Sequence, residues 1–228
     1  DENPILNNYD TINVEYTKNL VNEAKKNGVK HFIFMSSVKV YGEESNLIYK
    51  ENTICKPIDD YGKSKFKAEL YLQSLSSEDF IVSIIRTPII YGLGVKANIL
   101  NLINLIQKVP ILPFYGINNK RSMVYILNLC FFIHTIIQKK PQGIFLASDD
   151  DSISTTNFIK KISFYLKKKN LLIFIPFFSY LLKVFKPNLY SRLYLSLQVD
   201  NTLSKKKLDF KNPYTTNEGI LEMVNDLK

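Results

Sequence analysis

The stretch His31-Phe32-Ile33-Phe34-Met35-Ser36-Ser37 decides the fold that this 228-residue sequence predicts. Its first five residues form a short apolar run, which is typical of a β-strand buried on both faces of a sheet. Gly28 stands just before the run, where the helix predicted over residues 13–26 ends. A second helix is predicted over 61–75 and a second buried strand over 80–86. Because helix and strand alternate, we expect a parallel sheet with helices on both faces.

The pattern changes after Pro88. Helices are predicted over 95–108 and 127–138, an extended segment over 122–125 and a strand over 143–147, whereas residues 152–228 are mostly helical. We therefore expect an α/β chain in which residues 1–90 and 117–150 form the sheet domain. Residues 91–116 and 151–228 are expected to form a smaller, mostly helical lobe over the strand ends, where open parallel sheets bind ligands.

Composition argues against several classes of protein. The 30 basic and 21 acidic residues leave a net charge of +9, which suits an anionic ligand, but no recognition motif accompanies the charge, so we expect no nucleic-acid partner. Cys55 and Cys130 have neither metal-ligand nor disulfide spacing, so we expect a reducing compartment and no metal site. His31 and His134 likewise have no second ligand at helical spacing.

The most apolar stretch covers residues 171–185. It contains Pro176 and Lys183 and is too short to span a bilayer. With lysines at 167–169 and at 186 on its flanks, and with five aromatic residues, the segment 167–186 resembles a helix that lies on a membrane surface. Burial in the lobe is the alternative, and the sequence leaves both open.

Tyr61, Lys65 and Ser37 form a candidate proton-transfer site. A tyrosine and a lysine four residues apart lie on the same side of a helix. A free tyrosine has a pKa near 10 and is a poor base at neutral pH, but an ammonium group one turn away favours its phenolate. Ser37 follows the first strand at its carboxyl end. We expect Tyr61 to act as acid and base, Lys65 to lower its pKa, and Ser37 to hold a substrate oxygen.

Five ordered motifs carry a resemblance to a known family. They are Asn13-Val14-Glu15-Tyr16-Thr17; Phe32-Ile33-Phe34-Met35-Ser36-Ser37-Val38-Lys39-Val40-Tyr41-Gly42; Tyr61-Gly62-Lys63-Ser64-Lys65; Arg86-Thr87-Pro88 with Tyr91-Gly92; and Arg121-Ser122-Met123-Val124-Tyr125. From about Asn3 to Lys228, the chain resembles the extended short-chain dehydrogenase/reductase family, the NAD-dependent nucleotide-sugar epimerases and dehydratases. The resemblance implies a Rossmann-like doubly wound sheet, an NAD cofactor with NADP as the open alternative, and a cytoplasmic homodimer formed through the helices over 13–26 and 61–75.

The resemblance also implies roles for single residues. Ser37, Tyr61 and Lys65 match the family's catalytic residues, and Lys65 would also hold the nicotinamide ribose. The other matching positions are Asn13, Ser36 and Pro88 for the cofactor, and Asn98, Tyr115 and Arg121, with Ser37, for a nucleotide-diphosphate sugar. Simpler roles stay open: Asn13 as a helix cap, Asn98 as a surface residue, Tyr115 in packing, and Arg121 in the basic run with Lys120.

The chain also departs from the family's pattern. The family's first strands, its glycine-rich phosphate turn and its acidic ribose contact all precede the region that the chain covers. Gly92-Leu93-Gly94-Val95-Lys96-Ala97 fits G-x-G-x-x-A, but no acidic residue follows at the required spacing. Ile89 stands where many sugar epimerases have an asparagine.

Together these features predict an enzyme of nucleotide-sugar metabolism. We expect a 4-epimerase or a 4-ketoreductase/dehydrogenase that acts on a UDP-hexose or UDP-N-acetylhexosamine in surface polysaccharide biosynthesis. The alternative is a truncated, non-catalytic nucleotide-sugar-binding pseudoenzyme that lacks the phosphate-binding turn.

Overall fold

The computed structural model describes residues 9–43 and 47–227. The strands are β1 His31–Ser37, β2 Ile48–Tyr49, β3 Ile81–Thr87, β4 Ile89–Tyr91, β5 Ile111–Leu112, β6 Met123–Tyr125, β7 Gly143–Leu146, β8 Leu171–Leu172 and β9 Gln198–Val199. The α-helices are α1 Tyr16–Lys26, α2 Asp60–Leu75, α3 Ala97–Lys108, α4 Ile126–Lys139, α5 Thr155–Tyr165, α6 Phe178–Phe185, α7 Pro187–Tyr194, α8 Thr202–Leu208 and α9 Thr216–Asn225. The elements predicted up to residue 147 all occur, and their ends differ from the prediction by at most three residues.

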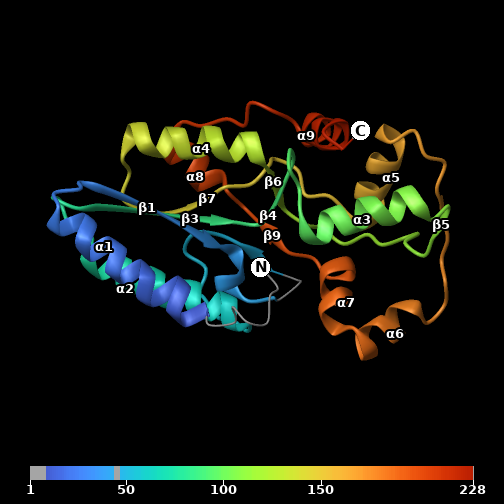
Figure 1. Ribbon diagram of the computed structural model, residues 1–228, viewed down its shortest axis with the longest axis horizontal. Coiled ribbons are helices and arrows are strands. Elements are labelled where there is room, and N and C mark those ends of the chain that lie inside the picture. Colours follow the sequence, from blue (N-terminus) through green and yellow to red (C-terminus); the bar gives the residue numbers. More distant parts are fainter. Residues whose placement is uncertain (1–8, 44–46, 228) are drawn as a thin grey trace.

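A parallel sheet with the strand order β1-β3-β7 forms the centre of the sheet domain. Helices α1 and α2 cover one of its faces, and α4 and α8 cover the other (Figure 1). In the register of β1 and β3, His31 lies opposite Ile81 and Ser37 opposite Thr87, so the two carboxyl ends lie level with each other. The predicted α/β sheet with helices on both faces is therefore confirmed.

Alternate residues of β3 serve the two faces of the sheet, which explains its continuous apolar run. Val82 and Ile84 join a core with Val21 of α1 and Leu72 of α2. Ile85 points to the other side and joins a second core, under α4 and α8. Each of these side chains is at most 2% exposed, and full burial of such a side chain stabilises the fold by about 1.5–3 kcal/mol.

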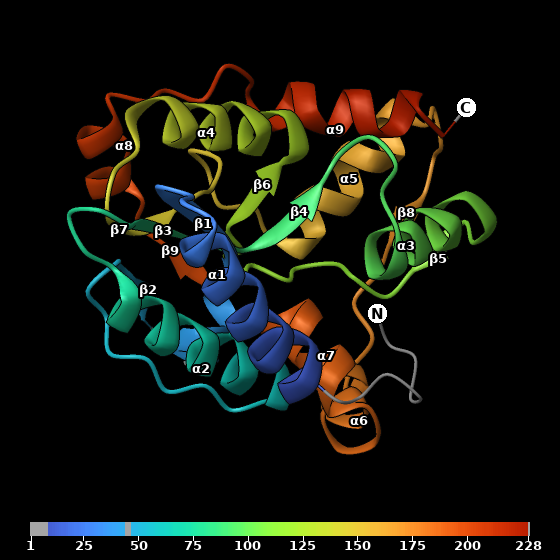
Figure 2. The same cartoon turned by 60° about the vertical axis from the view of Figure 1, so that its left-hand side comes forward.

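A second group of elements forms a lobe around α3, α5 and α9 (Figure 2). Its own core contains Ile103, Ile159 and Ile220, one from each of these helices. Part of the range predicted for the lobe lies elsewhere, because α8 returns to the sheet and places Leu208 in the core under α4. Among the described residues, no helix is long and apolar enough to cross a membrane.

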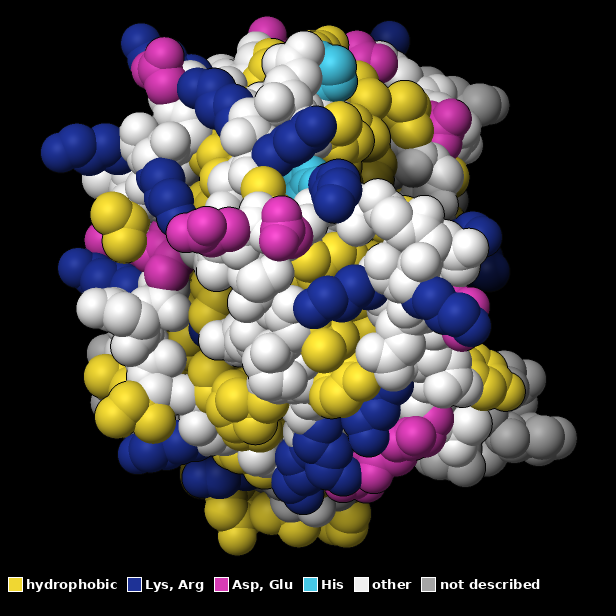
Figure 3. Space-filling model, turned by 90° about the vertical axis from the view of Figure 1, so that its left-hand side faces the viewer, with side chains coloured by type: hydrophobic (Ala, Val, Ile, Leu, Met, Phe, Trp, Pro, Cys, Tyr) yellow, Lys and Arg dark blue, Asp and Glu magenta, His cyan; other side chains and the backbone are white. Residues whose placement is uncertain are grey.

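The opposite end of the molecule, at which the strands begin, has a mixed surface. Lys and Arg side chains alternate there with Asp and Glu (Figure 3). The sheet domain also carries exposed ion pairs such as Lys67 with Asp10, at 2.6 Å. Exposed pairs of this kind contribute about 0–1 kcal/mol each. On the face shown, positive and negative side chains are therefore mixed, and neither sign of charge dominates.

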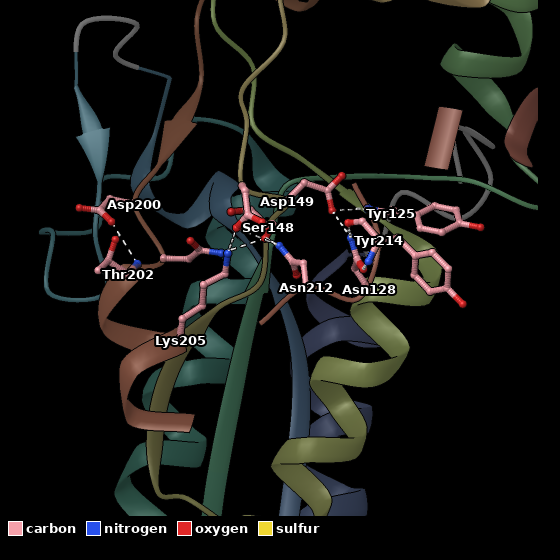
Figure 4. A network of polar contacts seen from close by, with 11 residues as sticks. Tyr125, Asn128, Ser148, Asp149, Asp200, Thr202, Lys205, Asn212 and Tyr214 are labelled. Atoms are coloured by element: carbon pink, nitrogen blue, oxygen red, sulfur yellow. Dashed lines mark hydrogen bonds and ion pairs between the residues drawn. The ribbon is translucent and has the colours of Figure 1, made fainter. Parts of the chain in front are cut away.

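A buried polar network joins the end of β7 to the lobe (Figure 4). The Asp149 carboxylate accepts hydrogen bonds from the Tyr91 hydroxyl at 2.6 Å, the Asn128 amide at 2.8 Å and the Tyr125 backbone N–H at 3.1 Å. Asn128 in turn accepts from the Tyr214 backbone N–H at 3.0 Å. Burial raises the pKa of Asp149, although these donors oppose the rise. The network fixes the segment after β7 to β4, β6 and α4.

Candidate active site

The start of α2 is fastened to the turn that follows β1. Asp59 caps the helix, because its Oδ1 accepts the Gly62 N–H at 2.6 Å. Gly62 packs so closely on the 3₁₀ turn Val38–Tyr41 that a Cβ at this position would lie 2.7 Å from the Lys39 carbonyl oxygen. Only glycine fits there without displacement. This close approach brings Tyr61, on the first turn of α2, beside Ser37 at the end of β1.

Ser37 lies close enough to Tyr61 to influence its titration. Burial raises the pKa of Tyr61, the hydrogen bond with the Ser37 hydroxyl lowers it, the charge of Asp59 raises it, and the charge of Lys39 lowers it. The net direction is upward. The Ser37 hydroxyl oxygen also accepts a hydrogen bond from the backbone N–H of Lys39 at 3.3 Å. Ser37 therefore caps the 3₁₀ turn Val38–Tyr41. The pair therefore forms a linked phenol and hydroxyl at the end of the sheet.

Lys65 lies one turn further along α2, on the same side as Tyr61. Its Nζ is 5.9 Å from the centre of the Tyr61 ring and 4.8 Å from that of Phe34. It donates a hydrogen bond to the Met35 carbonyl oxygen at 3.0 Å, and burial lowers the pKa of Lys65 itself. The expected effect of Lys65 on the pKa of Tyr61 stays a prediction.

Asn13 supports the site from behind, although it is not a helix cap. It lies inside a π-helical segment, Thr11–Glu15, which runs directly into α1. Its amide donates to the Ser64 hydroxyl at 2.9 Å, and Ser64 donates to the Tyr61 carbonyl oxygen at 2.8 Å. Single π-helical turns are often found at functional sites. The capping alternative therefore does not describe this residue.

Two adjoining cavities open beside this site. The smaller, of about 210 Å³, is lined by Ser37, Lys39, Pro88, Ile89 and Arg121, among others. The larger, of about 500 Å³, shares Lys39, Ile89 and Arg121 with it and extends between α3 and α7. A volume of this size is in the range of small-molecule binding sites. Most of the larger wall is apolar, so its few polar groups determine how a ligand can lie.

The predicted substrate residues divide into two groups. Arg121 lines both cavities; its Nη1 donates to the carbonyl oxygens of Ser191 at 3.2 Å and Leu195 at 3.0 Å. Asn98 lines the larger cavity, where its Oδ1 accepts from Arg192 at 2.9 Å. Tyr115, in contrast, is 56% exposed and does not line either cavity. The structure thus brings Asn98 and Arg121 together and leaves Tyr115 apart.

Sequence reasoning missed Lys39 and Arg192. Lys39 lies between the Tyr61 site and both cavities, pairs with Asp59 at 3.1 Å and also contacts Glu43. Arg192 comes from α7, far along the chain. One signal was present: only three of the 30 basic residues are arginines, and all three lie at or under this site. Arginine suits phosphate because its planar fork of donors pairs with two oxygens.

The residues present fit one end of a dinucleotide cofactor. The Ser36 hydroxyl is buried and has no hydrogen-bond partner among the described residues. Lys65 uses one of its three N–H groups on Met35, which leaves donors for ribose hydroxyls. Pro88 lines the smaller cavity. The G-x-G-x-x-A stretch is structural instead, since Gly92 packs against Tyr125 and the Gly94 N–H is bound by Asp226 at 2.8 Å.

This fold and this pair of Ser37 and Tyr61 define a class of protein. The chain belongs to the NAD dependent epimerase/dehydratase family, whose model matches residues 5–147. Membership confirms the predicted family, an NAD-dependent enzyme of the extended short-chain dehydrogenase/reductase type.

Individual relatives narrow the comparison. The chain is 40% identical over 221 residues to a UDP-glucose 4-epimerase of Vibrio cholerae, a match that spans 93% of this chain and 67% of the relative. It is 30% identical over 166 residues to the N-acetyl-alpha-D-glucosaminyl-diphospho-ditrans,octacis-undecaprenol 4-epimerase of Escherichia coli O157:H7, a match that spans 71% of this chain and 50% of the relative.

Solved structures support the fold. A UDP-N-acetylglucosamine 4-epimerase of Methanobrevibacter ruminantium superposes with a TM-score of 0.78 at 21% identity, covering 96% of this chain and 69% of that one. A UDP-glucuronic acid 4-epimerase of Bacillus cereus, in complex with NAD, gives 0.77 at 17% identity and covers 95% of this chain and 67% of that one. The Rossmann-like fold is thereby confirmed.

Proposed function

We propose that this chain carries the catalytic site of a nucleotide-sugar 4-epimerase that acts on a UDP-hexose or UDP-N-acetylhexosamine. The observation that carries the proposal is the position of Tyr61, on the first turn of α2, beside Ser37 at the end of β1, with Lys65 on the same helix face. The names of the relatives from V. cholerae and M. ruminantium support a UDP-linked sugar. A 4-ketoreductase would use the same residues. A role in surface polysaccharide synthesis is supported by the likeness of the stretches 86–88, 95–98 and 198–201 to the branch that acts on UDP-N-acetyl sugars.

In the proposed reaction, Tyr61 removes the proton from the sugar 4-hydroxyl and later returns it. Ser37 holds the sugar oxygen so that the proton moves along a fixed hydrogen bond. NAD, when bound, supplies the hydride chemistry that lets the configuration at that carbon change. Because burial raises the pKa of Tyr61, the protein has to provide positive charge to favour the phenolate. Lys39 already does so, and Lys65 is the second source that we propose.

The cavity supports a diphosphate ligand. Arg121 and Arg192 both line it, and Asn98 holds the guanidinium of Arg192. Burial lowers the pKa of Arg121, a shift that a bound phosphate would oppose because it favours the charged guanidinium. We propose that these two arginines hold the diphosphate and that the apolar wall formed by α3 takes the rest of the nucleotide.

The test is turnover of UDP-glucose and UDP-N-acetylglucosamine, followed by proton NMR in the presence of NAD. Tyr61→Phe removes the reacting hydroxyl and should abolish epimer formation. Tyr71→Phe is the matched control on the same helix, because its hydroxyl donates to Asn22 at the surface, at 2.9 Å, away from Ser37. Loss in both variants, or in neither, would contradict the assignment. Binding of the UDP-sugar without any turnover would favour the pseudoenzyme.

A homodimer through α1 and α2 is a further part of the proposal. Ile12, Tyr16 and Leu20 recur every four residues and are 43%, 61% and 63% exposed, so they form an apolar stripe along one helix face. Leu20→Asp should convert the dimer to a monomer in sedimentation experiments. Leu203→Asp on α8, where the leucine is 59% exposed, is the matched control and should leave the mass unchanged.

A sugar carried on a polyprenyl diphosphate is the second candidate substrate. The name of the E. coli relative states such a substrate for that protein. In this chain, α7 forms one wall of the larger cavity and is joined directly to α6, whose outer side is apolar. Turnover of a synthetic lipid-linked N-acetylglucosaminyl diphosphate in detergent, in preference to the UDP-sugar, would favour this candidate.

A further inference from the structure

The surface of α6 is unusually apolar for an outer helix. None of the residues of α6 and α7 is buried, and Phe174, Phe177 and Phe185 are 71%, 79% and 75% exposed. We call the exposed apolar set the α6 surface; it consists of Phe174, Phe177, Tyr180, Leu181, Val184 and Phe185. Contiguous apolar patches of this kind usually mark an interaction site.

The lobe holds α6 in a fixed orientation. The Phe178 ring meets the Phe114 ring edge to face, with 6.5 Å between their centres, and both belong to the core of the lobe. Leu182, one turn later, is also half-buried. These contacts place Phe178 and Leu182 on the side of α6 that packs on the lobe, and the α6 surface on the side exposed to solvent. It lies at the outer corner of the lobe (Figure 1), where hydrophobic side chains form the lowest part of the molecule (Figure 3).

Phe177 combines a strained backbone with an exposed ring. Its φ is +61°, in the left-handed region, which costs a non-glycine residue about 1–3 kcal/mol. In the isolated protein its ring packs against little and is mostly in contact with water. Backbone strain of this kind clusters at functional sites, where the surrounding structure holds it in place.

The positive charge around the α6 surface indicates which kind of partner can bind there. Residues 152–199 contain eight basic residues and no acidic one, so they carry +8 of the net charge of +9. Lys183 and Lys186 lie on α6 and at its end, beside the apolar side chains. A second copy of the chain would present the same positive charge, and the two would repel each other. An apolar, aromatic and basic surface matches the interface of a bilayer that contains anionic lipids.

We propose that the α6 surface docks this protein on an anionic lipid bilayer. The aromatic rings enter the headgroup region, and Lys183 and Lys186 contact lipid phosphates. Docking would bring α7, and with it the cavity wall that carries Leu189 and Arg192, next to the membrane. The inference rests on the surface and not on the proposed catalytic function, so the two can fail separately.

Flotation of the purified chain with lipid vesicles tests the proposal. We expect binding to vesicles of phosphatidylglycerol and phosphatidylcholine, weaker binding at high salt, and little binding to phosphatidylcholine alone. Removing two partly inserted rings with Phe177→Ser and Phe185→Ser should weaken binding about a hundredfold. Lys183→Gln and Lys186→Gln should weaken it about fivefold for each lysine.

The matched control changes two aliphatic residues that are equally exposed elsewhere. Ile54 and Ile58 are 76% and 62% exposed in the loop before α2, and Ile54→Ser with Ile58→Ser should leave vesicle binding unchanged. The proposal is overturned if the unaltered chain does not float with anionic vesicles, or if the control loses as much binding as the phenylalanine variant. It is also overturned if the phenylalanine variant alters only self-association in sedimentation. Thermal unfolding of each variant verifies that it is folded.

Discussion

The ion pair of Glu69 and Arg86 should be among the most stability-critical contacts of the chain. It ties the third turn of α2, the helix that carries Tyr61 and Lys65, to the end of β3. Arg86 Nε donates to Glu69 Oε1 at 3.0 Å and its Nη2 donates to Oε2 at 2.5 Å. The two side chains are 2% and 0% exposed. Burial alone would lower the pKa of Arg86, but the Glu69 carboxylate outweighs it, so the pKa of Arg86 is raised.

Glu69→Gln removes the negative charge and keeps the shape. It leaves the guanidinium buried without its carboxylate partner, since its neighbours Tyr41, whose ring lies at 4.6 Å, and Cys55 carry no full negative charge at neutral pH. Breaking a fully buried pair in this way costs about 3–5 kcal/mol of the free energy of unfolding. With a slope of about 3 kcal/mol per molar urea, the unfolding midpoint should fall by about 1–2 M.

A double variant separates the loss of the pair from the loss of packing. Glu69→Leu with Arg86→Met replaces both charges by apolar groups, which is often nearly neutral for a buried pair. We expect it to be clearly more stable than Glu69→Gln. A cost below about 1 kcal/mol for Glu69→Gln would refute the reasoning, because that is the range of a solvent-exposed pair.

Three further predictions concern the same region and the buried network. Gly62→Ala places a methyl group against the Lys39 carbonyl oxygen, so urea unfolding should reveal a loss of about 1–3 kcal/mol; unchanged stability would mean that the helix start shifts freely. Lys39→Met removes a positive charge that lowers the pKa of Tyr61, so the pKa of Tyr61 should rise further and its phenolate should form at higher pH. Ultraviolet titration, with the signal of the Tyr61→Phe variant subtracted, measures this pKa. A lower pKa in Lys39→Met would contradict the role assigned to Lys39. Asp149→Ala leaves three buried donors without their acceptor, and at about 1 kcal/mol or more for each donor thermal unfolding should show a loss of at least about 3 kcal/mol.

The parts of the fold that the sequence predicted are those encoded locally. The apolar run of β1, the helix period of α2 and the glycine at 28 each depend on neighbours within a few residues, so their patterns can be read directly. The four-residue spacing of Tyr61 and Lys65 fixed their common helix face. The pairing of β2 with β9 and of β5 with β8 could not be predicted. Each of these strands has only two residues, too few for an alternation of apolar and polar side chains to appear in the sequence.

The sequence alone determined the family and the sheet with its helices, and it predicted the site of Ser37, Tyr61 and Lys65, because each depends on short-range spacing and on residue type. Only the tertiary structure decided which other residues join the site. Arg192 meets Asn98 across 94 residues of sequence, and Arg86 meets Glu69 inside the core. Such partners are selected by packing between elements that are distant in the chain, and no local pattern records them.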